Sequence, residues 1–459
     1  MTSATARPEA RQPTVGLDDA LVSEVRDALE RDDALLASAL ATPLHPGDQA
    51  DLLQLLDKPE RAALVRALGL GLHADTLTYL AEDVRDAVIE LLGPRETGAA
   101  VAQLDTDDAI EVLGDLDPAE QSAILASLPM PERVVIEQGL AFPEYSAGRL
   151  MQRDVVAVPE YWNVGQVIDY LRSTQDLADV FYDIVIVDAR FSPVGAVPLS
   201  SIIRSRRSLT LRELPVKQLR LIPADMDQEQ VAFMFRQYGL VSAPVVDAAG
   251  RLLGVVTVDD VVDVIQEEAE DDILKLGGVQ ETDVYATPLR ASLNRLPWLA
   301  INLVTAILAS VVIAMFEGAI AQLVALAVLM PIVASMGGNA GTQTLTVAVR
   351  SLAMKELTPS NALRVLRKEA AVGAFNGLVF LLVGIGLVLA WFGDPRLAAV
   401  FGVAVLINLV AAAVAGLAIP VAIDRLGLDP AVSSGVFLTT VTDVVGFWAF
   451  LGLAAWLLL

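Results

Sequence analysis

Residues 431–458 read AVSSGVFLTTVTDVVGFWAFLGLAAWLL, an apolar segment interrupted by a single charged residue, Asp443. About 20 apolar residues suffice to cross the ~30 Å hydrocarbon core of a bilayer as a helix, so this segment predicts a membrane span. An ionisable side chain at that depth is costly and usually faces protein or a water-filled path, which favours a cation pathway around Asp443. A protonated Asp443 that hydrogen-bonds to a neighbouring helix is the alternative interpretation.

Four more apolar segments precede this one, at 296–316, 319–349, 370–392 and 397–423. Together they predict an all-α transmembrane domain of five helices over residues 295–459. Five basic residues lie in the connection between the second and third segments: Arg350, Lys355, Arg364, Arg367 and Lys368. Because basic loops remain in the cytosol, we expect a multi-pass protein of the cell inner (plasma) membrane. Its N-terminus would be cytoplasmic and its C-terminus outside.

The second apolar segment carries polar residues within the run PIVASMGGNAGTQT at 331–344. Four polar residues recur at helical spacing and would share one face: Ser335, Asn339, Thr342 and Thr346. The pair Gly337 and Gly341 favours close helix packing. Pro331 with these glycines could instead loosen the helix and expose backbone carbonyls to a cavity.

We predict that both polar segments line the cation pathway. On the last segment, Thr439, Asp443 and Gly446 share one helical face. On the second, Asn339 and Gly338 offer an amide and a backbone carbonyl. Such oxygen ligands suit a hard cation such as Mg²⁺, which gives up its water shell reluctantly.

Charge is distributed unevenly along the chain. The net charge is −25, and the residues before Trp298 carry 50 acidic and 25 basic groups. A strongly acidic soluble region argues against nucleic acid as a partner and favours cations. The chain has no cysteine, which excludes disulfides, thiolate metal sites and cysteine nucleophiles. His45 and His73 are the only histidines, and we expect both on the surface rather than in a zinc or iron centre.

The N-terminal part is predicted to be a stack of short helices. Residues 1–16 are polar and rich in Ala and Pro, so we expect them to be disordered and to contain no signal peptide. Over 17–145, Leu56, Leu80 and Leu104 recur at a 24-residue interval beside helix-start signals, which suggests an all-α superhelical scaffold. We interpret four of its acidic residues as part of a solvated face: Asp83, Asp105, Asp107 and Asp108.

Two similar β-α-β-β-α units follow, predicted over 146–210 and 211–262. This doubled unit resembles a CBS domain pair, and the resemblance implies binding of an adenine nucleotide such as ATP, or of a metal. Thr257 and Asp260 match the Thr/Ser-x-x-Asp turn that holds a nucleotide ribose in such domains. The corresponding turn of the first unit, at 198–201, has no Asp.

An amphipathic linker (plug) helix is predicted next at 261–276, leading into the linker region 263–294, and Gly277-Gly278 supplies its stop signal. Its apolar stripe would consist of Val261, Ile265, Ile273 and Leu276. Its polar side carries five clustered acidic residues: Glu267, Glu268, Glu270, Asp271 and Asp272. Because like charges this dense repel each other, we predict that the cluster, with Asp259 and Asp263, binds Mg²⁺ and regulates the protein. A solvated acidic face is the alternative.

Several motifs resemble the MgtE magnesium channel family. They are GGNAGTQ at 337–343, DPA at 429–431, TDVVG at 442–446, and VTVDD and EEAEDDILKLGGV between 256 and 279. The order of helical domain, CBS pair, linker helix and five membrane helices is also similar to that of the family. One difference is Gly435-Val436, where family members often have Asn-Pro eight residues before the pore Asp.

This resemblance implies a magnesium-selective channel rather than an enzyme. It implies a homodimer in the lipid bilayer, with a pore lined by the second and fifth membrane helices and an Asp443 from each subunit facing one hydrated Mg²⁺. Uptake would run down the electrochemical gradient, and Mg²⁺ bound to the acidic cytosolic domains would close the pore through the linker helix. The alternatives are a secondary transporter of Co²⁺, Mn²⁺ or Ca²⁺, a CBS-bearing membrane receptor or scaffold, and an intramembrane aspartyl protease.

Overall fold

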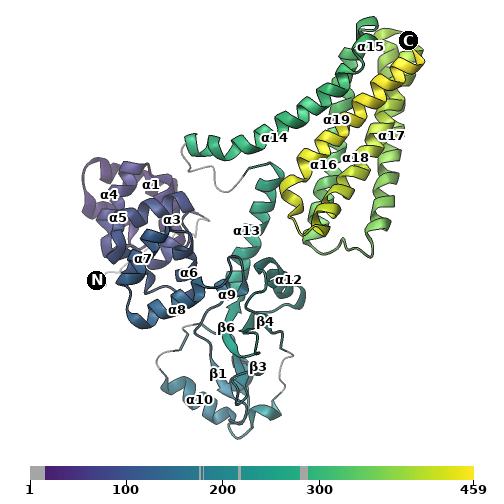
Figure 1. Ribbon diagram of the computed structural model, residues 1–459. Helices are drawn as coiled ribbons and strands as arrows, with labels where there is room; N and C mark the ends of the chain where they lie inside the picture. The colour runs from purple at the N-terminus through teal and green to yellow at the C-terminus, as the bar shows by residue number, and fades with distance from the viewer. Residues whose placement is uncertain (1–15, 175–176, 179, 215–218, 280–287, 459) are drawn as a thin grey trace, which may run out of the picture. The chain divides into compact units, whose positions relative to one another are not determined.

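The computed structural model describes residues 16–458 except 175–176, 179, 215–218 and 280–287 (Figure 1). The chain divides into two compact units, unit 1 up to Gln266 and unit 2 from Glu267. Residues 1–15, for which disorder is predicted, and residues 280–287 of the predicted linker region lie outside the described residues.

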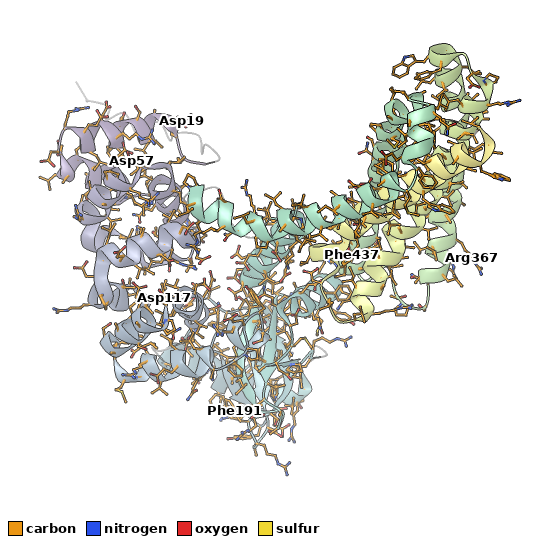
Figure 2. All side chains as sticks on the ribbon, turned by 45° about the horizontal axis from the view of Figure 1, so that its top comes forward. Asp19, Asp57, Asp117, Phe191, Arg367 and Phe437 are labelled. Carbon is orange, nitrogen blue, oxygen red and sulfur yellow. The ribbon has the colours of Figure 1, made fainter. Side chains whose placement is uncertain are left out.

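Between residues 19 and 140 every element is a helix, as predicted. Asp57 shows why these short helices begin where they do: its carboxylate accepts the Glu60 backbone N–H at 2.9 Å, which completes a capping box. Asp57 and Asp117, both N-caps, lie on the surface (Figure 2). The helices are α1 (Asp19–Glu30), α2 (Ala34–Ala41), α3 (Pro46–Leu55), α4 (Lys58–Leu68), α5 (Glu82–Val101), α6 (Thr106–Gly114), α7 (Pro118–Ser127) and α8 (Met130–Leu140), with 3-10 turns at Gly69–Gly71 and Ala74–Leu77.

Two three-stranded sheets of the same topology follow. In the first, β1 (Ala157–Pro159) pairs in parallel with β2 (Asp183–Val187), which pairs antiparallel with β3 (Pro193–Pro198). The second repeats this order with β4 (Ile222–Pro223), β5 (Ser242–Val246) and β6 (Leu252–Thr257). The accompanying helices are α9 (Ala147–Leu150), α10 (Val164–Ser173), α11 (Leu199–Arg204) and α12 (Gln228–Tyr238), with a 3-10 turn at Leu211–Glu213. This repeat confirms the predicted CBS pair.

Helix α13 (Val258–Leu276) starts directly after β6 and contains the division between the units. Its predicted stop is confirmed, because Gly278 adopts φ +68, a conformation that glycine accepts without strain. The predicted apolar stripe is partly wrong. Ile265 and Ile273 are exposed, and Val264 is buried beside Val261 instead. Only a short stretch of α13 packs on the core of the second CBS unit, and Val261 and Val264, three residues apart on one face, are enough to cover that contact.

Unit 2 contains the five long apolar helices that the sequence predicts. These are α14 (Pro288–Ala314), α16 (Ala325–Ala353), α17 (Ala362–Phe392), α18 (Pro395–Arg425) and α19 (Pro430–Leu457). The predicted segment 319–349 is not one helix: a short α15 (Glu317–Gln322) ends before Leu323, whose backbone is not helical. Helices α14 and α17 also begin several residues before their predicted spans. A membrane span ends where the sequence stops being apolar, but the helix can continue into polar residues. The Arg and Lys residues at the start of α17 are good helix formers, so the helix includes them.

Helix α18 is the centre of unit 2. About 61% of its apolar stretch is buried, against 6% for α14. Phe401 of α18 meets Phe450 of α19 edge-on with ring centroids 5.9 Å apart. Arg367, near the start of α17, points outward (Figure 2). The core therefore forms around α18, which leaves one face each of α16 and α19 uncovered.

Candidate functional site

The predicted polar stripe of α16 lies on the uncovered face of unit 2. All four of its members are exposed in the single chain: Ser335, Asn339, Thr342 and Thr346. The Thr342 hydroxyl donates to the Gly338 carbonyl at 2.9 Å, and Thr346 donates to the Thr342 carbonyl at 3.0 Å. Because each hydroxyl hydrogen is used within the helix, its oxygen lone pairs point outward as acceptors.

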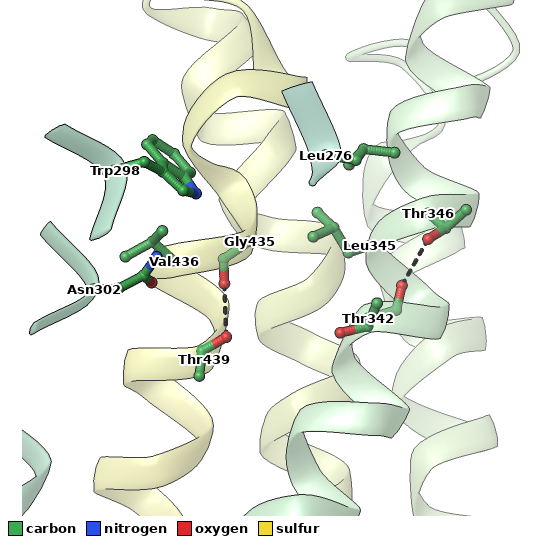
Figure 3. Close-up of a pocket in the computed structure, with 9 residues that line it drawn as sticks. All are labelled: Leu276, Trp298, Asn302, Thr342, Leu345, Thr346, Gly435, Val436 and Thr439. Carbon is green, nitrogen blue, oxygen red and sulfur yellow. Dashed lines mark hydrogen bonds between the residues drawn. The ribbon is translucent and has the colours of Figure 1, made fainter. Parts of the chain in front are cut away.

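Helix α19 presents a matching face. Thr439 is exposed and donates to the Gly435 carbonyl at 2.9 Å (Figure 3). Asp443, one turn further on, is half-buried, and its carboxylate makes no hydrogen bond or ion pair within the described part of the chain. The alternative of an Asp443 bonded to a neighbouring helix of the same chain is therefore not observed.

A cavity of about 210 Å³ opens between these faces (Figure 3). It is lined by Leu276, Trp298, Asn302, Thr342, Leu345, Thr346, Gly435, Val436 and Thr439. Gly435, where the family often has Asn, leaves open space: a Cβ there would approach only the Leu276 carbonyl, at 3.9 Å. Thr342, Thr346 and Thr439 of the predicted polar faces line this cavity, whereas Asn339 and Asp443 are not among its lining residues.

The two predicted glycines occupy different surroundings. A Cβ on Gly338 would meet nothing within 4 Å, so its backbone is open. Gly446 is buried, and a Cβ there would come within 2.6 Å of Asn408 Nδ2 on α18. Gly446 is therefore a packing residue toward α18, and it does not share the exposed face of Thr439.

Of the acidic residues interpreted as a solvated face, Asp105 is exposed as expected, whereas Asp107 is buried and Asp108 is half-buried. Asp107 is only 7% exposed, and burial, followed by the nearby Asp260 carboxylate, raises its pKa well above the usual value. Burial and repulsion from Glu111 and Asp260 raise the pKa of Asp108 to about 7. The pKa of Asp260 rises to about 6, mainly through burial. Carboxyl groups in this state hold a proton or a cation in place of lost hydration.

Asp259 and Asp263 extend this group along α13. Burial and then the Asp259 charge raise the pKa of Asp263, while Asp259 itself is exposed. Within the described residues, no three acidic or histidine side chains are arranged to ligate a bare ion.

The linker cluster in the second half of α13 is partly paired. Lys275 forms ion pairs with Asp271 and, at 2.8 Å, with Asp429. Burial and then the Asp429 charge raise the pKa of Asp272 to about 6. Glu267 and Glu270 are exposed and Glu268 is half-buried. Of the five acids, Asp271 is paired with Lys275, which lies one turn further along the same helix.

The predicted nucleotide turn lies beside a hollow of about 20 Å³. Thr257 lines the hollow with residues of the first CBS unit, including Tyr182 and Asp183. Asp260 does not line it, because its carboxylate accepts the Thr257 hydroxyl at 2.5 Å and faces Asp107. Of the predicted pair, Thr257 alone is placed to contact a ligand in this hollow.

These parts define a multi-pass membrane transport protein, not an enzyme. A family model described as a divalent cation transporter matches residues 330–453, and models of the MgtE intracellular N domain and of the CBS domain match 44–145 and 211–267. The chain belongs to the MgtE family of magnesium transporters.

Two relatives carry this assignment. The magnesium transporter MgtE of Thermus thermophilus is 37% identical over 71% of this chain and 73% of its own length. That of Enterococcus faecalis is 34% identical over 70% of this chain and 71% of its own length. The solved cytosolic domain of the Mg²⁺ channel MgtE in complex with ATP is 28% identical, with a TM-score of 0.49 over 53% of this chain and 99% of that one.

Proposed function

We propose that this chain forms a homodimeric, magnesium-selective channel with a pore between the uncovered faces of α16 and α19. The observation that carries the proposal is the exposure of Asn339, Thr439 and the α16 hydroxyls on one side of the bundle. In a lipid environment unpaired polar groups are costly. A two-fold axis through this face would bring two copies of the same polar surface together around water.

The ion pathway follows from the side chains of that surface. Two Asp443 carboxylates, one from each copy, would attract a divalent cation, and Asn339 and Thr439 would hydrogen-bond to its waters. Mg²⁺ fits because it prefers oxygen ligands and keeps its hydration shell. Binding through water is also loose enough to let the ion leave, as conduction requires.

Closure would depend on Mg²⁺ inside the cell. The raised pKa values of Asp108 and Asp260 show that their ionised forms are disfavoured in this compact unit. Bound Mg²⁺ would stabilise the compact form, and the acidic linker residues Glu267, Glu268 and Glu270 would add to this differential binding. The linker helix would then hold the pore closed.

We also propose that the hollow beside Thr257 receives the ribose or phosphates of an adenine nucleotide such as ATP. The proposal rests on the hydroxyl of Thr257 and on the aromatic side chains of Phe181 and Tyr182 that line the hollow with it. A nucleotide there would contact both CBS units and would act as a regulator.

Flux through purified protein in liposomes tests the proposed function. We expect Mg²⁺ to enter down its gradient without a proton gradient. Flux that requires a proton gradient would favour a secondary transporter of divalent cations, and absence of flux would favour a receptor or scaffold. Cleavage of a transmembrane peptide that depends on Asp443 would favour a protease.

A further inference from the structure

Asn408 lies in the middle of α18 and is completely buried. Its Nδ2 donates to the Val333 carbonyl of α16 at 2.9 Å. Its Oδ1 is also buried and has no hydrogen-bond partner among the described atoms. A side-chain amide inside a membrane domain is costly unless its hydrogen bonds are made, so its presence needs a reason.

Two glycines make room for this amide. A Cβ on Gly337 of α16 would collide with Asn408 Nδ2, and one on Gly446 of α19 would come within 2.6 Å of the same atom. Asn408 therefore touches the backbones of both α16 and α19. No larger residue fits at either glycine unless the Asn408 amide or a helix moves.

The contact lies close to the polar residues of the proposed pathway. Asn339 follows Gly337 by two residues, and Asp443 precedes Gly446 by three. Helices α16 and α19 run antiparallel, since Leu326 and Leu329 pack in one cluster with Phe450 and Leu451 from the far end of α19. A helix rises about 1.5 Å per residue, so Asn339 lies about 3 Å along the axis from Gly337, and Asp443 lies about 4.5 Å from Gly446. Because the helices are antiparallel, both displacements point in the same direction. Asn339 and Asp443 therefore lie at nearly the same depth.

We propose that Asn408 is a positioning residue for the ion pathway, which sets the spacing and depth of Asn339 and Asp443 by contact with both helices. This rests on the proposed function, because the two helices must line a pathway for their spacing to matter. Its hydrogen bond to Val333 fixes α16, and its contact with Gly446 fixes α19. Asn408 itself does not touch the ion.

The test is a comparison of flux in liposomes that contain the full-length protein. We expect Asn408→Leu, which keeps the branched shape but loses the donor, to lower Mg²⁺ flux about three- to tenfold, the size of one lost hydrogen bond. It should also change the half-saturating Mg²⁺ concentration and the ratio of Mg²⁺ to Ca²⁺ flux. Asn408→Ser, a smaller residue that retains a donor, should bring the half-saturating concentration and the ion ratio part of the way back to their wild-type values. Val400→Ala, a buried change elsewhere on α18, should leave both unchanged.

A second pair of variants separates positioning from general packing. Gly337→Ala should reduce flux because its methyl group meets Asn408, and addition of Asn408→Ala should restore part of the loss by removing the obstacle. Gly386→Ala on α17, where a Cβ meets nothing within 4 Å, is the matched control.

Three outcomes would overturn the inference. If the losses of the two single variants simply add in the double variant, Gly337 and Asn408 do not interact, and the inference loses the contact on which it rests. A lower melting temperature with unchanged half-saturation and unchanged ion ratio would make Asn408 a structural residue only. A wild-type protein that conducts no Mg²⁺ would overturn the proposed function first, and this inference with it.

Discussion

The Lys275 ammonium lies 2.8 Å from the Asp429 carboxylate, and that carboxylate also caps helix α19 by accepting the Ala431 backbone N–H at 2.8 Å. One side chain thus links the end of α13 to the first turn of the helix that carries Asp443. Leu276 packs beside this link in a cluster with Ala431 and Leu438. The end of α13 is therefore in direct contact with the start of α19.

Loss of this ion pair should weaken closure. Both partners are about one-third exposed, so the pair is worth only about 0.2–1 kcal/mol. We expect Lys275→Met to shift the internal Mg²⁺ concentration that half-closes the channel upward by at most about fivefold. Patch recordings or liposome flux at graded internal Mg²⁺ would measure it. Lys368→Met, at the exposed start of α17, is the control, and equal shifts in both variants would contradict the assignment.

Replacement of the intramembrane carboxylate should stop conduction. We expect Asp443→Ala to abolish Mg²⁺ flux while dimers persist on gel filtration, because no other acidic side chain lies deep in a described span. Asp443→Asn should retain some flux, since an amide still orients water. Glu317→Ala, at the end of the bundle, should conduct normally. Full flux in Asp443→Ala would rule out the carboxylate as a pathway residue.

Periodic and local features of the sequence predicted much of this molecule. The five spans, the exposed α16 stripe and the stop at Gly278 each depend on residues that lie within one continuous segment of the chain. Asn408 was missed although it is also a polar residue within an apolar segment, and the reasoning applied to Asp443 would have marked it. Its neighbours Gly337 and Gly446 could not have been paired with it, because helix packing alone brings them together.

The burial of Asp107 was missed for a related reason. An acidic residue in the first turn of a short helix is usually solvated and favourable there. Asp107 is buried because Asp260, far along the chain, lies against it. The break between α15 and α16 also had no local signal in an apolar segment that reads as continuous.

Nucleotide binding should depend on one hydroxyl. Thr257 lines the hollow between the two CBS units, so we expect Thr257→Val to weaken ATP binding about fivefold or more, the worth of one hydrogen bond. Calorimetry on the detergent-solubilised full-length protein would measure it. Ser200→Ala, in the corresponding turn of the first unit, should bind as the wild type does. Equal affinity in all three proteins would place the nucleotide elsewhere.

Acid and Mg²⁺ should stabilise unit 1 in the same way. The folded pKa values of Asp108 and Asp260, about 7 and about 6, are raised above the ordinary 3.8. Such groups stabilise the folded state when they are protonated. Their contribution to the free energy of unfolding is therefore complete below pH 3.8 and is lost as the pH rises through 6 to 7. Without Mg²⁺, the hydrogen-exchange protection of α6 in the full-length protein should therefore be about tenfold greater at pH 5.5 than at 7.5, after correction for intrinsic rates.

Mg²⁺ added at pH 7.5 should restore this protection, because a bound cation offsets the same repulsion that a proton does. Asp107→Asn should raise the protection of α6 at pH 7.5 without Mg²⁺ and reduce the further gain from Mg²⁺. Asp51→Asn, an exposed residue of α3, should change neither quantity. If α6 were equally protected at both pH values, or if Asp107→Asn responded to Mg²⁺ as the wild type does, these buried acids would have no part in sensing the ion.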